Sequence, residues 1–165
     1  MGHARYIVAA SLAVAIAKPA YAAEQDQLKA AIVYNIIRFT RFVPPPEGGV
    51  SLCVLASGAL SQAIATVDGK AVPDGRVQVR IVSHVSELRA GCTIAYIGAN
   101  LGPPNYDGVP MVIGETADFA ERGGAVGLTR FGRQISFELN PKAAAARGVR
   151  FSSRLLSLAS LVHGR

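Results

Sequence analysis

Apolar runs divide the chain into short strands with helical segments between them. Residues 51–56, 92–97 and 110–114 are continuous apolar stretches bounded by Gly, Pro or polar residues, a pattern typical of buried strands. Residues 76–82 alternate polar and apolar positions, which predicts a half-exposed strand near a sheet edge. Apolar positions recur every three or four residues over 24–43, which predicts a buried helix that Pro44-Pro45-Pro46 ends. Shorter helices are predicted over 59–67 and 86–90.

The second half of the chain repeats this alternation. Residues 116–122 read as a helix capped by Thr116. Residues 125–130 and 134–139 read as two strands joined in a hairpin across Gly132. Asn140 followed by Pro141 predicts a helix start, and Gly148 predicts its end. A last helix should begin at Ser152 or Ser153 and run to about Val162.

This order of elements predicts an α/β fold. We expect a mainly parallel mixed sheet with helices on both faces and an antiparallel hairpin near the C-terminus. The chain has 165 residues, of which 50% are hydrophobic and 17% are charged, so a disordered chain is excluded. This length fits one domain, which we assign to residues 23–165.

The first 22 residues have the pattern of a secretory signal peptide. Arg5 precedes an uncharged apolar run over 6–17, and small residues precede the polar start at Glu24. The apolar run is too short to cross a bilayer, so we expect cleavage rather than anchoring. The best cleavage position is after Ala22, and a cut after Ala23 is nearly as good. The mature protein is then expected in an extracytoplasmic compartment.

The net charge of +6 bears on the choice of partner. Removal of residues 1–22 takes away two basic residues and no acid, so the mature chain stays basic. An exported protein does not meet nucleic acid in the ordinary course, and we expect no nucleic-acid partner. The charge favours an acidic partner, an anionic ligand or a membrane headgroup surface; a merely basic protein is the alternative.

Cys53 and Cys92 are the only cysteines. Both lie beyond the signal segment, in apolar runs that read as strands, and an oxidising compartment favours their pairing. Two buried free thiols remain the alternative. A metal site is not expected, because the spacing differs from that of paired zinc ligands and no histidine lies close.

The search for catalytic residues finds little. His84 and His163 are the histidines outside the signal segment, and neither belongs to a metal-ligand pair or a known catalytic motif. Asp118 and Glu121 lie three residues apart, but a solvated face explains them better than a catalytic pair. We therefore expect no enzymatic activity, no catalytic residues and no cofactor or metal.

The C-terminal segment is the best candidate for binding. Residues 147–156 combine three arginines with apolar neighbours, the composition that interface hot spots favour. The alternative is that the apolar residues belong to the core and the arginines only face solvent. A binder of a small anion or amino acid in a cleft of the α/β fold is a further alternative.

Six segments, in order, resemble the family of YfiR-like periplasmic regulators. Residues 31–42 (AIVYNIIRFTRF) resemble the family's opening helix YNxxRFTxW, with Phe42 in place of the usual Trp. Residues 52–55 (LCVL) and 89–97 (RAGCTIAYI) resemble two of its strands. Residues 119–128 (FAERGGAVGL), 135–140 (ISFELN) and 152–159 (SSRLLSLA) resemble its last three motifs. Each motif is weak alone, but six in order are specific.

The resemblance implies a periplasmic protein that represses an inner-membrane diguanylate cyclase. It would bind the periplasmic sensor domain of the cyclase, lower cyclic-di-GMP production and so restrain biofilm formation. An outer-membrane lipoprotein partner and a homodimer are implied as well. The family's disulfide matches Cys53 and Cys92. With the composition of the C-terminal segment, the resemblance favours Arg150, Phe151, Arg154 and Leu155 as partner-binding residues.

Overall fold

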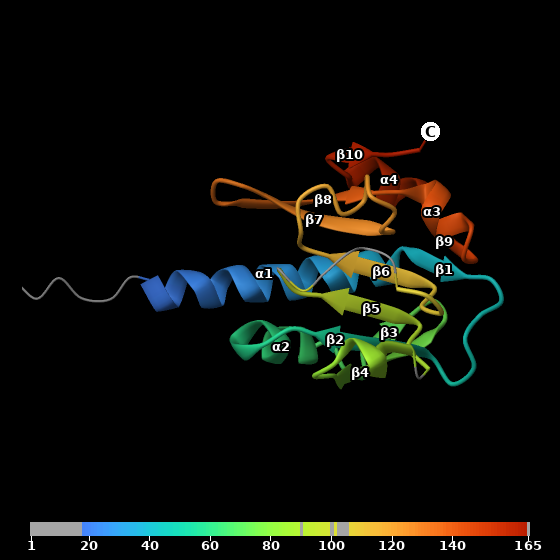
Figure 1. Cartoon of the computed structure of the whole chain (residues 1–165), viewed down its shortest axis with the longest axis horizontal. Coiled ribbons are helices and arrows are strands. Elements are labelled where there is room, and N and C mark those ends of the chain that lie inside the picture. The colour runs from blue at the N-terminus through green and yellow to red at the C-terminus, as the bar shows by residue number, and fades with distance from the viewer. Residues whose placement is uncertain (1–17, 90, 100, 102–105, 165) are drawn as a thin grey trace, which may run out of the picture.

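The computed structural model describes residues 18–89, 91–99, 101 and 106–164. Within these residues an eight-stranded sheet has the order β10-β8-β7-β6-β5-β2-β4-β3, and a separate two-stranded sheet pairs β1 with β9 (Figure 1). The strands are β1 (Thr40–Phe42), β2 (Val50–Leu55), β3 (Ala71–Val72), β4 (Gly75–Ile81), β5 (Ile94–Ile97), β6 (Met111–Gly114), β7 (Val126–Phe131), β8 (Gln134–Leu139), β9 (Val149–Phe151) and β10 (Leu161–Val162). The helices are α1 (Lys18–Arg38), α2 (Gly58–Ala65), the 3-10 helix η1 (Val85–Arg89), α3 (Pro141–Ala145) and α4 (Ser153–Leu158).

The predicted α/β class is confirmed. Strands β4, β2, β5, β6 and β7 run parallel, and β7 and β8 form the antiparallel hairpin. The hairpin turns at Gly132, whose φ of 60° lies in the left-handed region that glycine tolerates. Strand β4 has only the two-residue β3 beyond it, which fits its alternating sequence.

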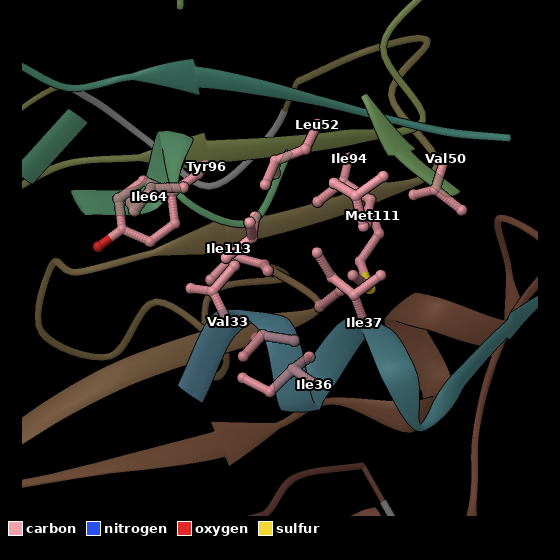
Figure 2. Close-up of a cluster of buried hydrophobic side chains, with 14 of the residues drawn as sticks. Val33, Ile36, Ile37, Val50, Leu52, Ile64, Ile94, Tyr96, Met111 and Ile113 are labelled. Atoms are coloured by element: carbon pink, nitrogen blue, oxygen red, sulfur yellow. The ribbon is translucent and has the colours of Figure 1, made fainter. Parts of the chain in front are cut away.

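Side-chain alternation along the strands builds a core on each face of the sheet. Val50, Leu52 and Val54 point to the face covered by α1 and α2, where Figure 2 shows Val33 and Ile37 of α1 directed at the strands. Cys53 and Leu55 point to the other face, which holds η1 and the loops after β5 and β6. In the part of the chain that the structure describes, α1 and α2 thus cover one face, and the second face is covered by η1 and loops.

Helix α1 ends earlier than the apolar spacing predicts. The expected helix 24–43 stops at Arg38, and Thr40–Phe42 forms β1, which pairs antiparallel with β9. The Thr40 hydroxyl donates to the Ile36 carbonyl at 2.7 Å, so it satisfies one acceptor at the helix end. Phe42, one of the apolar residues that suggested a longer helix, is instead a buried position of β1, whereas Val43 beyond it is exposed.

The prediction of a helix over residues 116–122 is wrong. These residues form successive turns in which Asp118 has a φ of 58°, a left-handed value that interrupts a helix. The Thr116 hydroxyl is buried without a hydrogen-bond partner, so it caps nothing. The turns place the Phe119 ring, 1% exposed, between the backbones of Gly114 and Gly124.

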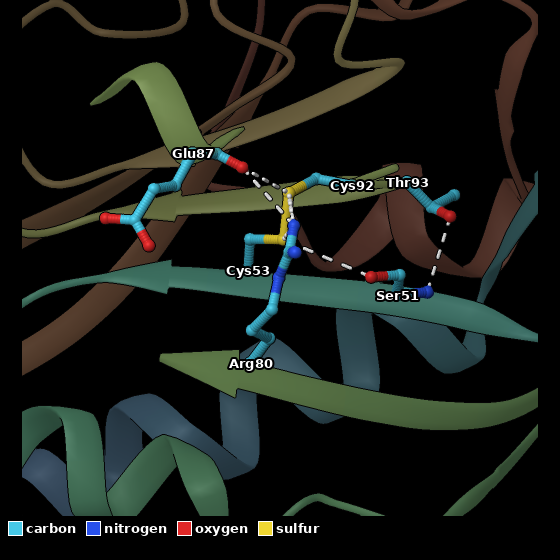
Figure 3. The surroundings of a disulfide bond; sticks show 6 residues. All are labelled: Ser51, Cys53, Arg80, Glu87, Cys92 and Thr93. Carbon is cyan, nitrogen blue, oxygen red and sulfur yellow. Dashed lines mark hydrogen bonds between the residues drawn. A yellow bond between two sulfur atoms is a disulfide. The ribbon is translucent and has the colours of Figure 1, made fainter. Parts of the chain in front are cut away.

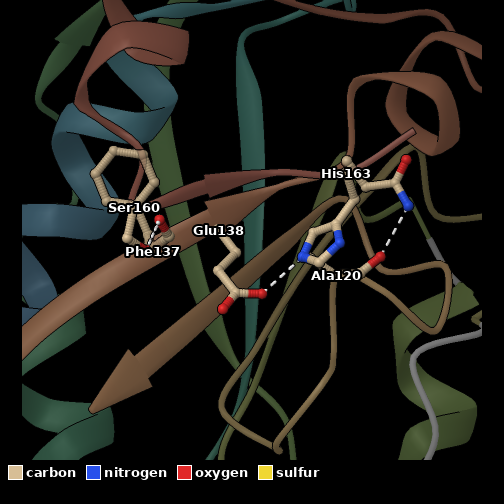
Figure 4. A network of polar contacts seen from close by, with 6 residues as sticks. Ala120, Phe137, Glu138, Ser160 and His163 are labelled. Atoms are coloured by element: carbon tan, nitrogen blue, oxygen red, sulfur yellow. Dashed lines mark hydrogen bonds and ion pairs between the residues drawn. The ribbon is translucent and has the colours of Figure 1, made fainter. Parts of the chain in front are cut away.

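The C-terminal elements begin as predicted and end differently. The Asn140 side chain accepts from the Ala143 amide at 2.9 Å, and the Ser152 hydroxyl accepts from the Leu155 amide at 3.2 Å, so both are helix caps. Helix α4 ends at Leu158 rather than near Val162, because Leu161 and Val162 add a parallel strand to β8. Figure 4 shows how side chains hold this strand: His163 meets Glu138 at 2.7 Å, and the Ser160 hydroxyl donates to the Phe137 carbonyl.

The predicted signal segment is only partly within the described residues. Residues 1–17 lie outside them, and the predicted cleavage residues Ala22 and Ala23 lie on α1 with exposed side chains. Among the described residues, no helix has both the length and the apolar character needed to span a bilayer.

Candidate functional site

A groove of about 420 Å³ lies where the C-terminal half of α1 meets α4 and β8. We call it the Phe39 groove. Its lining residues come from these three elements and the residue after α1: Ile32, Asn35, Ile36, Arg38, Phe39, Phe137, Arg154, Leu155 and Leu158. The lining contains two cations and no acidic side chain, so the groove presents an apolar floor with a positive rim.

Backbone pairing between distant segments positions the groove. Thr40 faces Phe151 in the β1–β9 ladder, and the Ser152 amide donates to the Phe39 carbonyl at 3.0 Å. Because Ser152 caps α4, this bond sets the first turn of α4 against the end of α1. The groove therefore depends on the short strand β1, which the apolar spacing had wrongly predicted to be part of the helix.

Two arginines flank the ring of Phe39. The guanidinium carbon of Arg38 lies 5.8 Å from the ring centroid, and that of Arg154 lies 5.6 Å from it. Both distances fall within the range of a cation–π attraction, worth about 0.5–1 kcal/mol at an exposed site. Both arginines are exposed, and so is Leu158 (58%), the apolar residue beside them. An exposed set of arginines and apolar side chains has the composition of a binding surface.

The four predicted partner-binding residues occupy different environments. Arg154 is exposed at the groove rim, and Leu155 is 1% exposed and forms part of the groove floor. Phe151 is half-buried and packs against the main core. Arg150 is exposed on β9, opposite Arg41 in the ladder and outside the groove lining. The structure thus brings Arg154 and Leu155 together and sets Arg150 apart.

Arg38, Phe39, Phe137 and Leu158 were missed as site residues. Arg38 and Phe39 are the adjacent Arg and Phe of the opening motif. A cation next to an aromatic residue near a predicted helix end could have indicated a binding surface there. Phe137 and Leu158 carried no such signal, because their positions depend on how β8 and α4 pack.

A disulfide joins Cys53 and Cys92, as predicted, with their Cα atoms 5.7 Å apart. Cys53 lies on β2, and Cys92 lies two residues before β5, the parallel neighbour of β2. Both residues are buried, at 0% and 5% exposure. Figure 3 shows Arg80 of β4 reaching the sulfurs, with its Nη2 atom 3.3 Å from Cys53 Sγ and 3.1 Å from Cys92 Sγ.

A polar cluster lies under α1, at the carboxyl ends of β5 and β6. The Lys29 ammonium meets Glu115 Oε2 at 2.7 Å, and the Tyr96 hydroxyl donates to Glu115 Oε1. Tyr96 is fully buried (0%). Burial, and then the negative charge of Glu115, hold the pKa of Tyr96 well above its ordinary value. Glu115 is satisfied by these two partners, so the cluster is a structural ion pair.

Within the described ranges, no three His, Cys, Asp or Glu side chains come together in a way that could hold a metal ion. His163 is engaged with Glu138 beside the last strand, while His84 is exposed beside η1. His84 follows β4 and His163 follows β10, and neither lines the Phe39 groove.

Comparison with known proteins identifies the family. A family model described as YfiR/HmsC-like matches residues 26–160. The chain belongs to the YfiR/HmsC-like family. Membership of this family supports a periplasmic regulatory role in general terms.

Two solved structures are distantly similar to this YfiR/HmsC-like chain. One is a conserved domain protein from Vibrio cholerae O1 biovar El Tor, at 11% identity and a TM-score of 0.49. Another is the ABC domain in complex with L-Trp from Streptococcus pneumonia, at 11% identity and a TM-score of 0.48. Each match covers 83% of this chain and 60% of the other. No curated protein matches the chain.

Proposed function

We propose that this protein represses an inner-membrane diguanylate cyclase by binding the cyclase's periplasmic sensor domain. The family match over residues 26–160 supports the regulatory class, and the exposed arginines at Phe39 support action through contact. Binding would favour the inactive form of the sensor domain, a population shift that lowers cyclic-di-GMP and biofilm formation. The regulator needs no chemistry of its own for this mechanism.

The Phe39 groove is the proposed contact surface, and Arg150 and Phe151, which lie outside its lining, would extend that surface along β9. Arg38 and Arg154 supply two cations over an apolar floor, and Leu158 adds exposed apolar area. Arginine and aromatic residues at the centre of a surface patch carry most of the energy in typical interfaces. An acidic, apolar segment of the sensor domain would complement this surface.

The decisive experiment is a deletion with complementation. We expect deletion of the gene to raise cellular cyclic-di-GMP and surface attachment, and the native gene to restore both. A gene carrying Arg38→Glu and Arg154→Glu should fail to restore them, whereas the matched charge reversal Arg122→Glu, on an exposed turn outside the groove, should succeed. Unchanged cyclic-di-GMP on deletion would contradict the function. Full restoration by the double variant would contradict only the proposal that the Phe39 groove is the contact surface.

A second candidate rests on the same groove. Its volume of about 420 Å³ falls within the range of small-ligand sites, and two guanidinium groups at an apolar hollow suit an anion or an amino acid carboxylate. Calorimetric titration of the purified protein with amino acids and small anions tests this binding module. A saturable signal that Arg154→Ala removes would support it, and flat titrations across the panel would exclude it.

Export, dimerisation and a lipoprotein partner are also proposals. Mass spectrometry of protein from the periplasm should find a new N-terminus at Ala23 or Glu24, and an intact Met1 would contradict a cleaved signal. Light scattering after gel filtration tests the homodimer. Crosslinking in cells tests the outer-membrane lipoprotein, which would compete with the cyclase for this regulator.

A further inference from the structure

Strand β8 is unpaired along part of its outer side. It pairs with β7 over its whole length, whereas the two-residue β10 covers only Glu138 and Leu139 on the other side. Among the described residues no strand lies beside residues 134–137, which we call the β8 edge. Figure 1 shows this part of the β7–β8 hairpin reaching past the neighbouring strands of the sheet. An open edge of this kind is a template for a further strand.

The backbone groups of the β8 edge point away from the sheet at every second residue. In an antiparallel ladder, the residues that do not bond the partner strand direct their N–H and C=O outward. The carbonyls of Phe137 and Leu139 accept from the amides of Ser160 and His163, which shows that the odd-numbered residues are the outward ones. Ile135 is the next such residue. Within the described ranges, nothing bonds its outward N–H and C=O or the Phe137 N–H.

An apolar stripe of α1 lies beside the β8 edge. Gln25, Leu28 and Ile32 follow one another at steps of three and four residues, so they share one face of the helix. The Gln25 side-chain amide donates to the Arg133 carbonyl at the hairpin turn, and Ile32 lines the Phe39 groove together with Phe137. Leu28 lies between these two contacts and is 42% exposed. The stripe therefore continues the Phe39 groove along the β8 edge towards the hairpin turn.

The charged side chains at both ends of this surface are cationic. Arg38 and Arg154 line the Phe39 groove at one end, and Arg133 lies in the hairpin turn at the other. Strands β7 and β8 contain no acid before Glu138, which is engaged with His163. Acidic residues at the ends of a bound segment would complement these arginines, whereas a second copy of the same edge would bring like charges together.

We infer that the β8 edge binds an extended apolar segment of the cyclase sensor domain, with acidic residues at its ends, as an added strand. The inference rests on the proposed function, because it takes the sensor domain as the partner. Main-chain hydrogen bonds to Ile135 and Phe137 hold the segment, while its apolar side chains lie on Leu28 and Ile32. Strand addition to an exposed sheet edge is an established mode of peptide recognition.

The open backbone groups favour an extended segment over a helix. A helix bonds its own N–H and C=O groups internally, so a helix laid on this edge would cover the backbone of Ile135 and Phe137 without bonding it. Covering a polar group without a partner costs free energy. A strand supplies a matching donor or acceptor at every second residue. The edge therefore selects the conformation of the partner segment, and the stripe of α1 selects its apolar side chains.

Hydrogen exchange at single amides tests this inference directly. Exchange is followed by nuclear magnetic resonance in native protein, free and saturated with purified cyclase sensor domain. The Ile135 and Phe137 amides should exchange at least about tenfold more slowly in the complex. Arg130 is the matched control, because it pairs with Ile135 and lies beyond the last β6–β7 pair, so its N–H points out from the other side of the same hairpin. Its exchange should change by less than about twofold.

Two variants at one position separate the backbone from the side chain. Ile135→Pro removes the outward N–H and leaves the bonds to β7, at an edge position where a strand tolerates proline. Ile135→Ala removes the side chain and keeps the N–H. We expect Ile135→Pro to weaken calorimetric binding of the sensor domain about tenfold more than Ile135→Ala does. Circular dichroism and urea unfolding check that both variants fold, and the exchange data on native protein decide the matter if Ile135→Pro does not.

The possible results distinguish this inference from the proposed function. If the sensor domain binds native protein but leaves exchange at Ile135 and Phe137 unchanged, the inference is overturned and the proposed function stands. Equal losses of affinity in the two folded variants would overturn it in the same way. A sensor domain that does not bind would overturn both. Slower exchange in the free protein that grows with protein concentration would identify a second copy at the edge, which also overturns the inference.

Discussion

The guanidinium carbon of Arg154 lies 5.6 Å from the centroid of the Phe39 ring, although the two residues come from opposite ends of the chain. The Ser152 amide donates to the carbonyl of the same Phe39, so backbone and side chain both hold α4 against the end of α1. The exposed cation is thereby oriented over the groove without being needed in the core. Arg154, which we propose to bind a partner, is thus exposed and separate from the buried core.

That separation predicts the behaviour of Arg154→Ala. The variant should lose at most about 1 kcal/mol of unfolding free energy, because the cation–π contact is exposed. Its affinity for the cyclase sensor domain should fall about tenfold or more, as expected for an arginine hot spot. Urea unfolding and calorimetric binding measure the two effects. Arg122→Ala is the control, and equal affinity losses in both variants would contradict a specific role for the groove.

The fold class could be predicted from the sequence because it rests on local patterns. The apolar run at 51–56 marks a buried strand, and Asn140-Pro141 marks a helix start, whatever lies around them. The pairing of Cys53 with Cys92 was expected because the only two cysteines lie beyond the signal segment, in a part of the chain where an oxidising compartment favours their joining. These inferences needed only residue type and spacing.

The strands that the sequence analysis missed form only by pairing with segments that are distant in the sequence. Thr40–Phe42 continues the helical spacing of α1 and becomes a strand only because Val149–Phe151 lies beside it. Leu161 and Val162 continue the apolar pattern of α4 and become a strand only because β8 has an open edge there. The groove depends on the β1–β9 pairing, so Arg38 and Phe39 could not be assigned to it from spacing alone.

The disulfide should contribute strongly to stability. It closes a separation of 39 residues, and removal of that constraint lowers unfolding free energy by about 4 kcal/mol in the loop-entropy model. We expect the double variant Cys53→Ala/Cys92→Ala to show a loss of this order in urea unfolding. Cys53→Ser should likewise lower the melting temperature. A double-variant loss below about 1 kcal/mol would show that the surrounding core, rather than the bond, holds β2 to β5.

The position of Phe119 between two glycines predicts a steric coupling. A methyl group added at Gly114 would overlap the Phe119 ring, and neither backbone position there has a positive φ. Gly114→Ala should therefore cost about 1–3 kcal/mol through overpacking. Phe119→Leu makes room, so the double variant should be more stable than the sum of the single losses by about 1 kcal/mol. Additive losses in urea unfolding would contradict this packing.

Tyr96 predicts a loss of stability at alkaline pH. Its pKa is raised in the folded state, first by burial and then by the charge of Glu115, whereas the unfolded chain ionises near the ordinary value of 10.0. Above that pH the unfolded state gives up a proton that the folded state retains. Unfolding free energy should then fall by about 1.4 kcal/mol per pH unit from this residue. Below that pH Tyr96 is protonated in both the folded and the unfolded state, so its contribution to the unfolding free energy does not change with pH.

The measurement compares native protein with Tyr96→Phe by urea unfolding between neutral and alkaline pH. The variant should start lower by about 1.5–3 kcal/mol, because Glu115 loses a charge-assisted hydrogen bond and keeps only Lys29. Its stability should then decline less steeply, so the two curves approach one another above the ordinary tyrosine pKa. Burial also raises the pKa of Tyr106, but that residue is present in both proteins and cancels. Parallel curves across the whole range would contradict a raised pKa of Tyr96 in the folded state.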